Sequence, residues 1–219
     1  MRDVILKSGE RSEPLDGENY IIQSESGYRF GSDAVKLASF ASARIGKTDR
    51  VYDLCSGCGV VGILLNIATG CSVRGAELDE RLFDMSVRSC AYNGQSEVLF
   101  VNADVRDLTG IEPPAAFDAV VCNPPFYKAD AKKRKTAPQA NSELTVTFAD
   151  VVRAAKHLLK AGGAFYIVHT LSRLDEVLRA CGDAALTPKN LVVNTNGKTF
   201  LLRCVRGGKL GLTVKTEKW

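Results

Sequence analysis

Apolar residues along this chain recur with the spacings of helices and of strands. One group, spaced by three and four residues after Gly31-Ser32-Asp33, predicts a capped helix over about 33–44. Its members are Ala34, Leu37, Ala38 and Ala41. From residue 50 onward, short apolar runs alternate with longer amphipathic segments. The predicted strands are 51–54, 72–76, 98–101, 117–122, 164–168, 191–194 and 200–205. The predicted helices are 60–68, 80–92, the stripe 148–159 and 171–181.

This alternation of strands and helices predicts an α/β fold whose sheet is mostly parallel, with helices on both faces. The last two strands flank Asn196-Gly197, a strong hairpin signal, so we expect a seven-stranded sheet that ends in an antiparallel C-terminal hairpin. Residues 1–45 are expected to form an N-terminal extension and capping helix, with short edge strands at Ile5-Leu6 and Ile21-Ile22. Residues 46–219 are expected to form the main domain, and the whole chain one globular unit.

Composition places the chain among ordinary globular proteins. Of its 219 residues, 45% are hydrophobic and 25% charged, and apolar runs such as Val60–Leu65 are too short to cross a bilayer. The N-terminus lacks the apolar run of a signal peptide, and seven cysteines, an odd number, favour reduced thiols. We therefore expect a cytoplasmic protein with no membrane partner. Only one Cys-x-x-Cys pair and two histidines are present, so no metal site is expected.

A glycine-containing turn follows the strand at 51–54. Gly57 and Gly59 stand between a strand and a helix, where backbone N–H groups can approach a ligand. Glu77, twenty residues after Gly57, and Asp104 end the next two strands and are placed to accept hydrogen bonds from a ribose and an adenine. NAD fits this much of the pattern. Asp53, however, would face a pyrophosphate unfavourably and suits an ammonium group, which indicates S-adenosylmethionine (SAM).

The fourth strand ends in Asn123-Pro124-Pro125-Phe126. An amine conjugated to a ring is a poor nucleophile because its lone pair is delocalised. Acceptors at its N–H groups, here the Asn123 side chain and the Pro124 carbonyl, would localise that lone pair toward a methyl group. Pro125 helps to fix the backbone, and Phe126 offers a face on which a planar group can stack.

Together these residues resemble the motifs of Rossmann-like class I SAM-dependent methyltransferases that modify planar amino groups. The resemblance implies that Asp53, Gly57 and Gly59 hold the methionine part of SAM, Glu77 the ribose and Asp104 the adenine, with Asn123 beside the methyl group. The segment 28–38 is similar to one in the bacterial family that methylates N6 of adenine 37 in a valine tRNA, which implies that Phe30 and Asp33 lie near the cofactor.

The sequence departs from this family where Cys55 and Cys58 replace the commonest Gly and Thr. These two cysteines either form a redox pair or, as we expect, are small residues that fill space in a cofactor loop. The segment Arg203–Leu212 is similar to the family's closing segment, and its charges would extend an RNA-binding surface.

The net charge of +4 is concentrated after the tetrapeptide, because residues 128–135 carry five basic residues and one acid. We expect these basic residues to contact RNA, and tRNA in particular. They are Lys128, Lys132, Lys133, Arg134 and Lys135. We expect no obligate protein partner and a monomer or weak homodimer. The alternatives are a protein-glutamine N5 enzyme, a ribosomal-RNA guanine-N2 enzyme, and a SAM- or RNA-binding module without activity.

Overall fold

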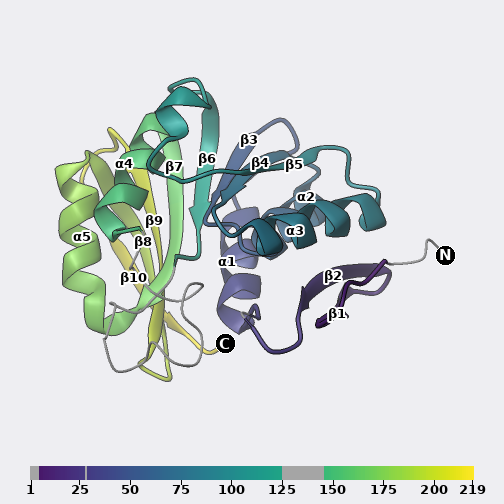
Figure 1. Cartoon of the computed structure of the whole chain (residues 1–219). Helices are drawn as coiled ribbons and strands as arrows, with labels where there is room; N and C mark the ends of the chain where they lie inside the picture. Colours follow the sequence, from purple (N-terminus) through teal and green to yellow (C-terminus); the bar gives the residue numbers. More distant parts are fainter. Residues whose placement is uncertain (1–4, 28, 125–145) are drawn as a thin grey trace.

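The computed structural model describes residues 5–27, 29–124 and 146–219. Within these residues, the central sheet has eight strands in the order β10-β8-β9-β7-β6-β3-β4-β5 (Figure 1). Strands β3 to β7 are parallel, β9 is antiparallel to its neighbours β7 and β8, and β10 is parallel to β8. The strands are β3 (Arg50–Leu54), β4 (Ser72–Glu77), β5 (Val98–Asn102), β6 (Phe117–Cys122), β7 (Leu159–Thr170), β8 (Leu186–Asn194), β9 (Thr199–Arg206) and β10 (Thr213–Glu217).

Helices cover both faces of this sheet because each face carries its own cluster of buried apolar side chains. One face is packed by α1 (Ser32–Ser42), α2 (Val60–Thr69) and α3 (Glu80–Asn93). The other is packed by α4 (Phe148–Leu158) and α5 (Leu174–Asp183). Two short 3-10 helices are η1 (Leu108–Gly110) and η2 (Leu171–Arg173). None of the helices in the described part of the chain is long and apolar enough to span a bilayer. The predicted α/β fold class is confirmed.

The N-terminal residues form a hairpin of β1 (Glu10–Asp16) and β2 (Asn19–Ser24) that packs on α3. The amide of Ile22 donates to Ser89 Oγ (2.9 Å), and Arg88 Nη2 pairs with Glu10 Oε1 (2.7 Å). Ile21 and Ile22 are buried in the same apolar cluster as α1 and α2. The extension therefore shares a core with the main sheet. The prediction of an edge strand at Ile5-Leu6 was wrong, since both residues lie outside any strand and are exposed.

The prediction of seven strands was also wrong, because Thr213–Glu217 add the eighth strand, β10. All five of its residues are exposed, so no apolar face marks it in the sequence. The helix predicted up to Leu159 ends at Leu158, where β7 begins directly. The carbonyl of Leu158 accepts from the amide of Ala116 (2.9 Å), and Leu159 pairs with Phe117 in the sheet. Pairing with β6 therefore decides this boundary.

Candidate active site

The carboxyl ends of the parallel strands β3, β4 and β6 meet at one edge of the sheet. The register places Leu54 beside Ala76 on one side and beside Cys122 on the other. The residues that follow them, Cys55, Glu77 and Asn123, thus lie in one row across β3, β4 and β6. Ligands of open α/β sheets bind at this edge.

The loop between β3 and α2 has three residues in the left-handed region: Cys55 (φ 55°), Gly57 (φ 58°) and Gly59 (φ 87°). A Cβ atom on Gly59 would lie 2.8 Å from Phe100 Cε2 and 2.9 Å from Ser86 Cβ. Packing and backbone conformation both therefore require glycine at position 59. The backbone of Cys55 adopts a left-handed conformation that residues other than glycine rarely take. Cysteine at this position, where the family most often has glycine, therefore stores local strain.

Asp53 lies beneath this loop and is 1% exposed. Its Oδ2 accepts from the amide of Gly62 (2.9 Å), in the first turn of α2. Gly59, the N-cap of α2, has no side chain to fill that role. Burial raises the pKa of Asp53 to about 8. The hydrogen bond from Gly62 lowers this pKa, and the charge of Glu77 raises it further.

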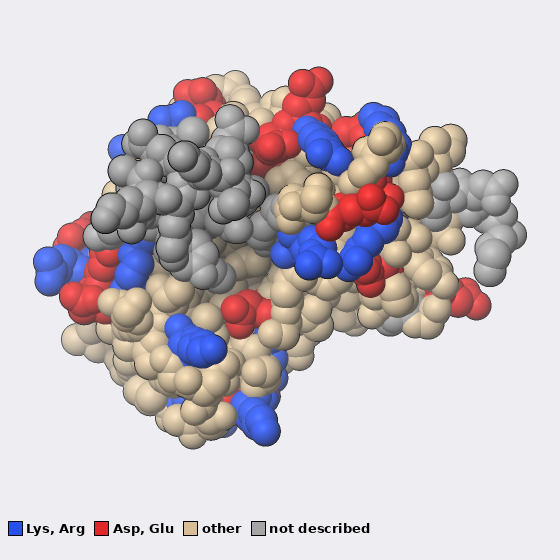
Figure 2. Space-filling view, turned by 60° about the horizontal axis from the view of Figure 1, so that its bottom comes forward, with Lys and Arg blue, Asp and Glu red and all other residues tan. Residues whose placement is uncertain are grey.

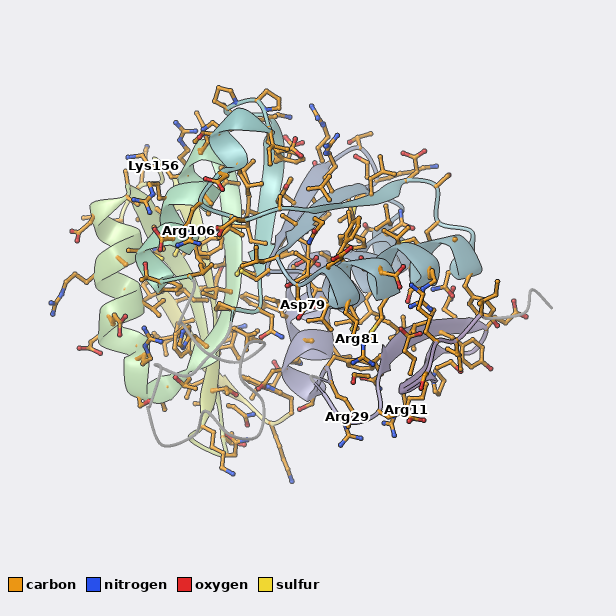
Figure 3. All side chains as sticks on the ribbon, in the orientation of Figure 1. Arg11, Arg29, Asp79, Arg81, Arg106 and Lys156 are labelled. Carbon is orange, nitrogen blue, oxygen red and sulfur yellow. The ribbon has the colours of Figure 1, made fainter. Side chains whose placement is uncertain are left out.

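Glu77 connects the loop to the start of α3. Its Oε2 accepts from the amide of Gly57 (2.7 Å), and its Oε1 accepts from the amide of Asp79 (2.9 Å). Asp79 in turn caps α3 through the amides of Arg81 and Leu82 (Figure 3). Burial raises the pKa of Glu77. Gly57 and Glu77, twenty residues apart in the sequence, are thus in direct contact.

Asp104 follows β5 and is held by Arg106, a partner that the sequence analysis did not identify (Figure 3). Asp104 Oδ1 accepts from the amide of Arg106 (2.8 Å) and from its Nε (3.0 Å), and Oδ2 also accepts from Nε (3.0 Å). These hydrogen bonds hold the pKa of Asp104 below its usual range. A ligand amino group at Asp104 would therefore share its carboxylate with a guanidinium.

Asn123 and Pro124 follow β6, the strand between β3 and β7. Asn123 is half-buried and Pro124 is buried. The remaining residues predicted for methyl transfer and RNA contact lie outside the described residues. They are Pro125, Phe126, Lys128, Lys132, Lys133, Arg134 and Lys135.

Phe30 and Asp33 lie at the start of α1. Phe30 packs against the apolar cluster beneath α1 and α2. Asp33 does not cap the helix, which begins at Ser32 after Gly31 without a side-chain cap. Its Oδ1 instead accepts from Trp219 Nε1 (2.7 Å) and Thr199 Oγ1 (3.2 Å). No local sequence signal could reveal these partners, because they lie more than 160 residues away along the chain.

The cysteines in this region are free thiols. Cys58 is buried, and burial raises the pKa of its thiol to about 12, which makes it unreactive. Cys55 is half-buried, and its thiol raises the pKa of the neighbouring Cys122 thiol in addition to the effect of burial. Among the described residues, no cluster of three or more His, Cys, Asp or Glu side chains could hold a metal ion.

Comparison with known proteins gives a consistent result. A tRNA1(Val) (adenine(37)-N6)-methyltransferase of Flavobacterium johnsoniae is 26% identical over 148 residues, which are 67% of this chain and 63% of that relative. A protein of the same name from Flavobacterium psychrophilum is 22% identical over 76% of this chain and 71% of its own length. The chain thus spans just under two thirds of the first relative.

A solved structure of a predicted O-methyltransferase from Agrobacterium tumefaciens has the same fold, with a TM-score of 0.64 at 20% identity, over 85% of this chain and 86% of that one. The family model described as "Methyltransferase small domain" matches residues 30–181. This chain therefore belongs to the methyltransferase small domain family, whose methyl donor is SAM.

Proposed function

We propose that this protein transfers the methyl group of SAM to the exocyclic N6 amine of an adenine in RNA, and that this adenine is position 37 of a tRNA. The observation that carries the proposal is the position of Asn123-Pro124, which follow β6 in the same row as Glu77 and the start of the loop between β3 and α2. The names of the two Flavobacterium relatives support the choice of adenine and of tRNA.

The residues present fit this cofactor. Each oxygen of Glu77 accepts one backbone N–H, which leaves one lone pair on each for a ribose hydroxyl. The hydroxyl of Ser56, in the loop itself, is buried without a hydrogen-bond partner. Asp53, Gly57 and Gly59 would hold the methionine part, Asp104 the adenine, and Phe30 and Asp33 would lie over the bound molecule.

The protein's contribution to the reaction is to position and activate the amine. SAM supplies a methyl group on a positively charged sulfur. Oδ1 of Asn123 and the carbonyl of Pro124 accept from the two N–H groups of the target amine, which directs its lone pair toward the methyl group. Pro124 is buried, so its carbonyl has a fixed position. Asn123 is neutral and does not act as a base, so the methylated amine would release its proton to solvent after the transfer. Catalysis therefore rests on orientation and exclusion of water.

The substitution Asn123→Ala tests this assignment. We expect methyl transfer to fall by at least about a hundredfold, as when one aligned polar group is removed from other active sites, while SAM affinity changes little. Asn66→Ala is a matched control, because Asn66 lies in α2 and donates to the carbonyl of Cys71 (2.8 Å). The Asn66→Ala variant should retain both methyl transfer and SAM affinity. Undiminished turnover in Asn123→Ala would refute the mechanism, and label transferred to a protein glutamine would refute the substrate.

A further inference from the structure

The C-terminal strands carry a second excess of positive charge. Residues 186–219 contain seven basic residues and one acid, Glu217, a net charge of +6. With +4 in residues 128–135, the rest of the chain has a net charge of −6. The charge of the main domain is thus unevenly distributed, with the basic part in β8, β9, β10 and their connections. This basic strip consists of Lys189, Lys198, Arg203, Arg206, Lys209, Lys215 and Lys218.

The charges of the basic strip are not balanced by neighbouring carboxylates. Among the described residues, none of its seven side chains forms an ion pair with a carboxylate. Nine other basic side chains do form such pairs. They are Lys7, Arg11, Lys36, Arg74, Arg88, Arg106, Arg153, Lys160 and Arg173. Unpaired charge of one sign on neighbouring strands is costly unless a ligand of opposite charge binds there.

Strand β10 contributes almost nothing to the core, because every one of its residues is exposed. It is nevertheless fixed in place. Trp219 Nε1 donates to Asp33 Oδ1 (2.7 Å), Glu217 pairs with Lys36 of α1, and Asn194 Nδ2 donates to the carbonyl of Trp219 (3.2 Å). Figure 1 shows the chain end beside the lower end of α1. The side chains of β10 are therefore accessible at the surface while the strand itself is anchored.

The basic strip begins at the edge that holds the candidate active site. Lys198 immediately precedes β9, whose first residue pairs with Thr170, the last residue of β7. Lys218 follows Glu217, which pairs with Asn194 at the end of β8. Strands lie about 4.8 Å apart, so these lysines lie about 10 and 19 Å from β6 across the sheet. Figure 2, turned so that this side comes forward, shows single Lys and Arg side chains separated by uncharged and acidic residues.

From that edge the basic strip extends along the strands. Arg203 and Thr213 both pair with Asn190, and Lys215 pairs with Val192, so Arg203 and Lys215 point to the same face. Lys189 and Arg206 lie near the opposite edge. Arg206 pairs with Leu186, which packs in the other apolar cluster, so its side chain points to the other face. At about 3.3 Å per residue, the five residues from Lys198 to Arg203 span roughly 16 Å. That length accommodates several consecutive phosphates.

We infer that the basic strip binds the phosphate backbone of the RNA whose adenine is methylated, along the part of that RNA that leads away from the target base. This inference rests on the proposed function. It adds a docking surface made of C-terminal strands, separate from the residues that hold SAM and the amine.

The test replaces three exposed lysines, in the variant Lys198→Gln, Lys215→Gln and Lys218→Gln. The control removes the same charge elsewhere, by Lys47→Gln, Lys156→Gln and Arg179→Gln, all exposed. The probe is an unmodified valine tRNA transcript, and its dissociation constant is measured as a function of salt. Each lost phosphate contact should reduce the slope of log K against log salt by about 0.7 to 0.9. Loss of all three contacts should weaken the affinity of the variant for the transcript roughly a hundredfold at 0.15 M salt.

SAM affinity should be unchanged in both variants, because neither alters a residue of the cofactor site. If the strip variant and the control bind the transcript with the same constant and the same slope, the docking surface is refuted. If the wild-type protein methylates protein and not RNA, the proposed function fails, while the slopes still show whether the basic strip binds RNA.

Discussion

Asp53 offers a sharp test of the site's electrostatics. Its carboxyl is buried, and its pKa moves from 3.8 to about 8 on folding. Between these values the unfolded chain has released a proton that the folded protein keeps, so stability falls as pH rises, by up to about 1.4 kcal/mol per pH unit. Over the whole interval the upper bound is about 6 kcal/mol. Asp53→Asn removes this dependence, so we expect the variant to gain stability over the wild type as pH rises from 5.5 to 8.

The measurement is denaturant unfolding of both proteins from pH 5.5 to 8.5. Asp118→Asn is the control: burial raises the pKa of Asp118, but hydrogen bonds from the Arg50 amide and from Lys160 outweigh burial and hold it below its usual value. Its stability difference should stay constant over this range. If the difference between wild type and Asp53→Asn is equally constant, the raised pKa is wrong. A bound SAM ammonium should lower the pKa of Asp53, so saturating SAM should reduce the pH-dependent difference.

Three further substitutions test the framework of the site by denaturant unfolding. Gly59→Ala would place a Cβ atom 2.8 Å from the Phe100 ring at a φ of 87°. It should lower the free energy of unfolding by at least about 2 kcal/mol, and an unchanged stability would contradict the packing argument. Cys55→Gly removes the backbone strain at a φ of 55°. It should raise the free energy of unfolding by up to about 1 kcal/mol and retain methyl transfer. A loss of stability would show that the contacts of the thiol outweigh the strain. Trp219→Phe removes the indole donor from Asp33 and should cost about 1 kcal/mol, and no loss would show that the hydrogen bond does not hold the C-terminal strand.

Much of the fold is encoded in local patterns. The apolar runs at β3, β4, β5 and β6 and the Asn196-Gly197 turn are strong signals, and the structure has these elements within a residue or a few of their predicted ends. Gly94 (φ 68°) caps the end of α3 at Asn93, one residue beyond the predicted end of the helix at 92. Strand β10 was missed because it is exposed on every residue and depends on pairing with β8.

In the candidate site, too, some features follow from local sequence patterns and others depend on contacts between distant parts of the chain. The spacing from Gly57 to Glu77 predicted a cofactor site at the ends of adjacent strands, and the structure adds a direct hydrogen bond between the two residues that the sequence did not predict. The partners of Asp104 and Asp33 were not predicted, for different reasons. Arg106 is near in sequence, but an arginine there has no special signature, whereas Trp219 reaches Asp33 only through the sheet order.

The central claim concerns the amine that receives the methyl group. The most direct measurement incubates the wild-type protein with SAM labelled in its methyl group and total RNA from cells that lack the enzyme, and then identifies the labelled nucleoside and its position. The account predicts N6-methyladenosine at position 37 of a tRNA. Label in a methylated guanosine, or in protein glutamine with none in RNA, would contradict it.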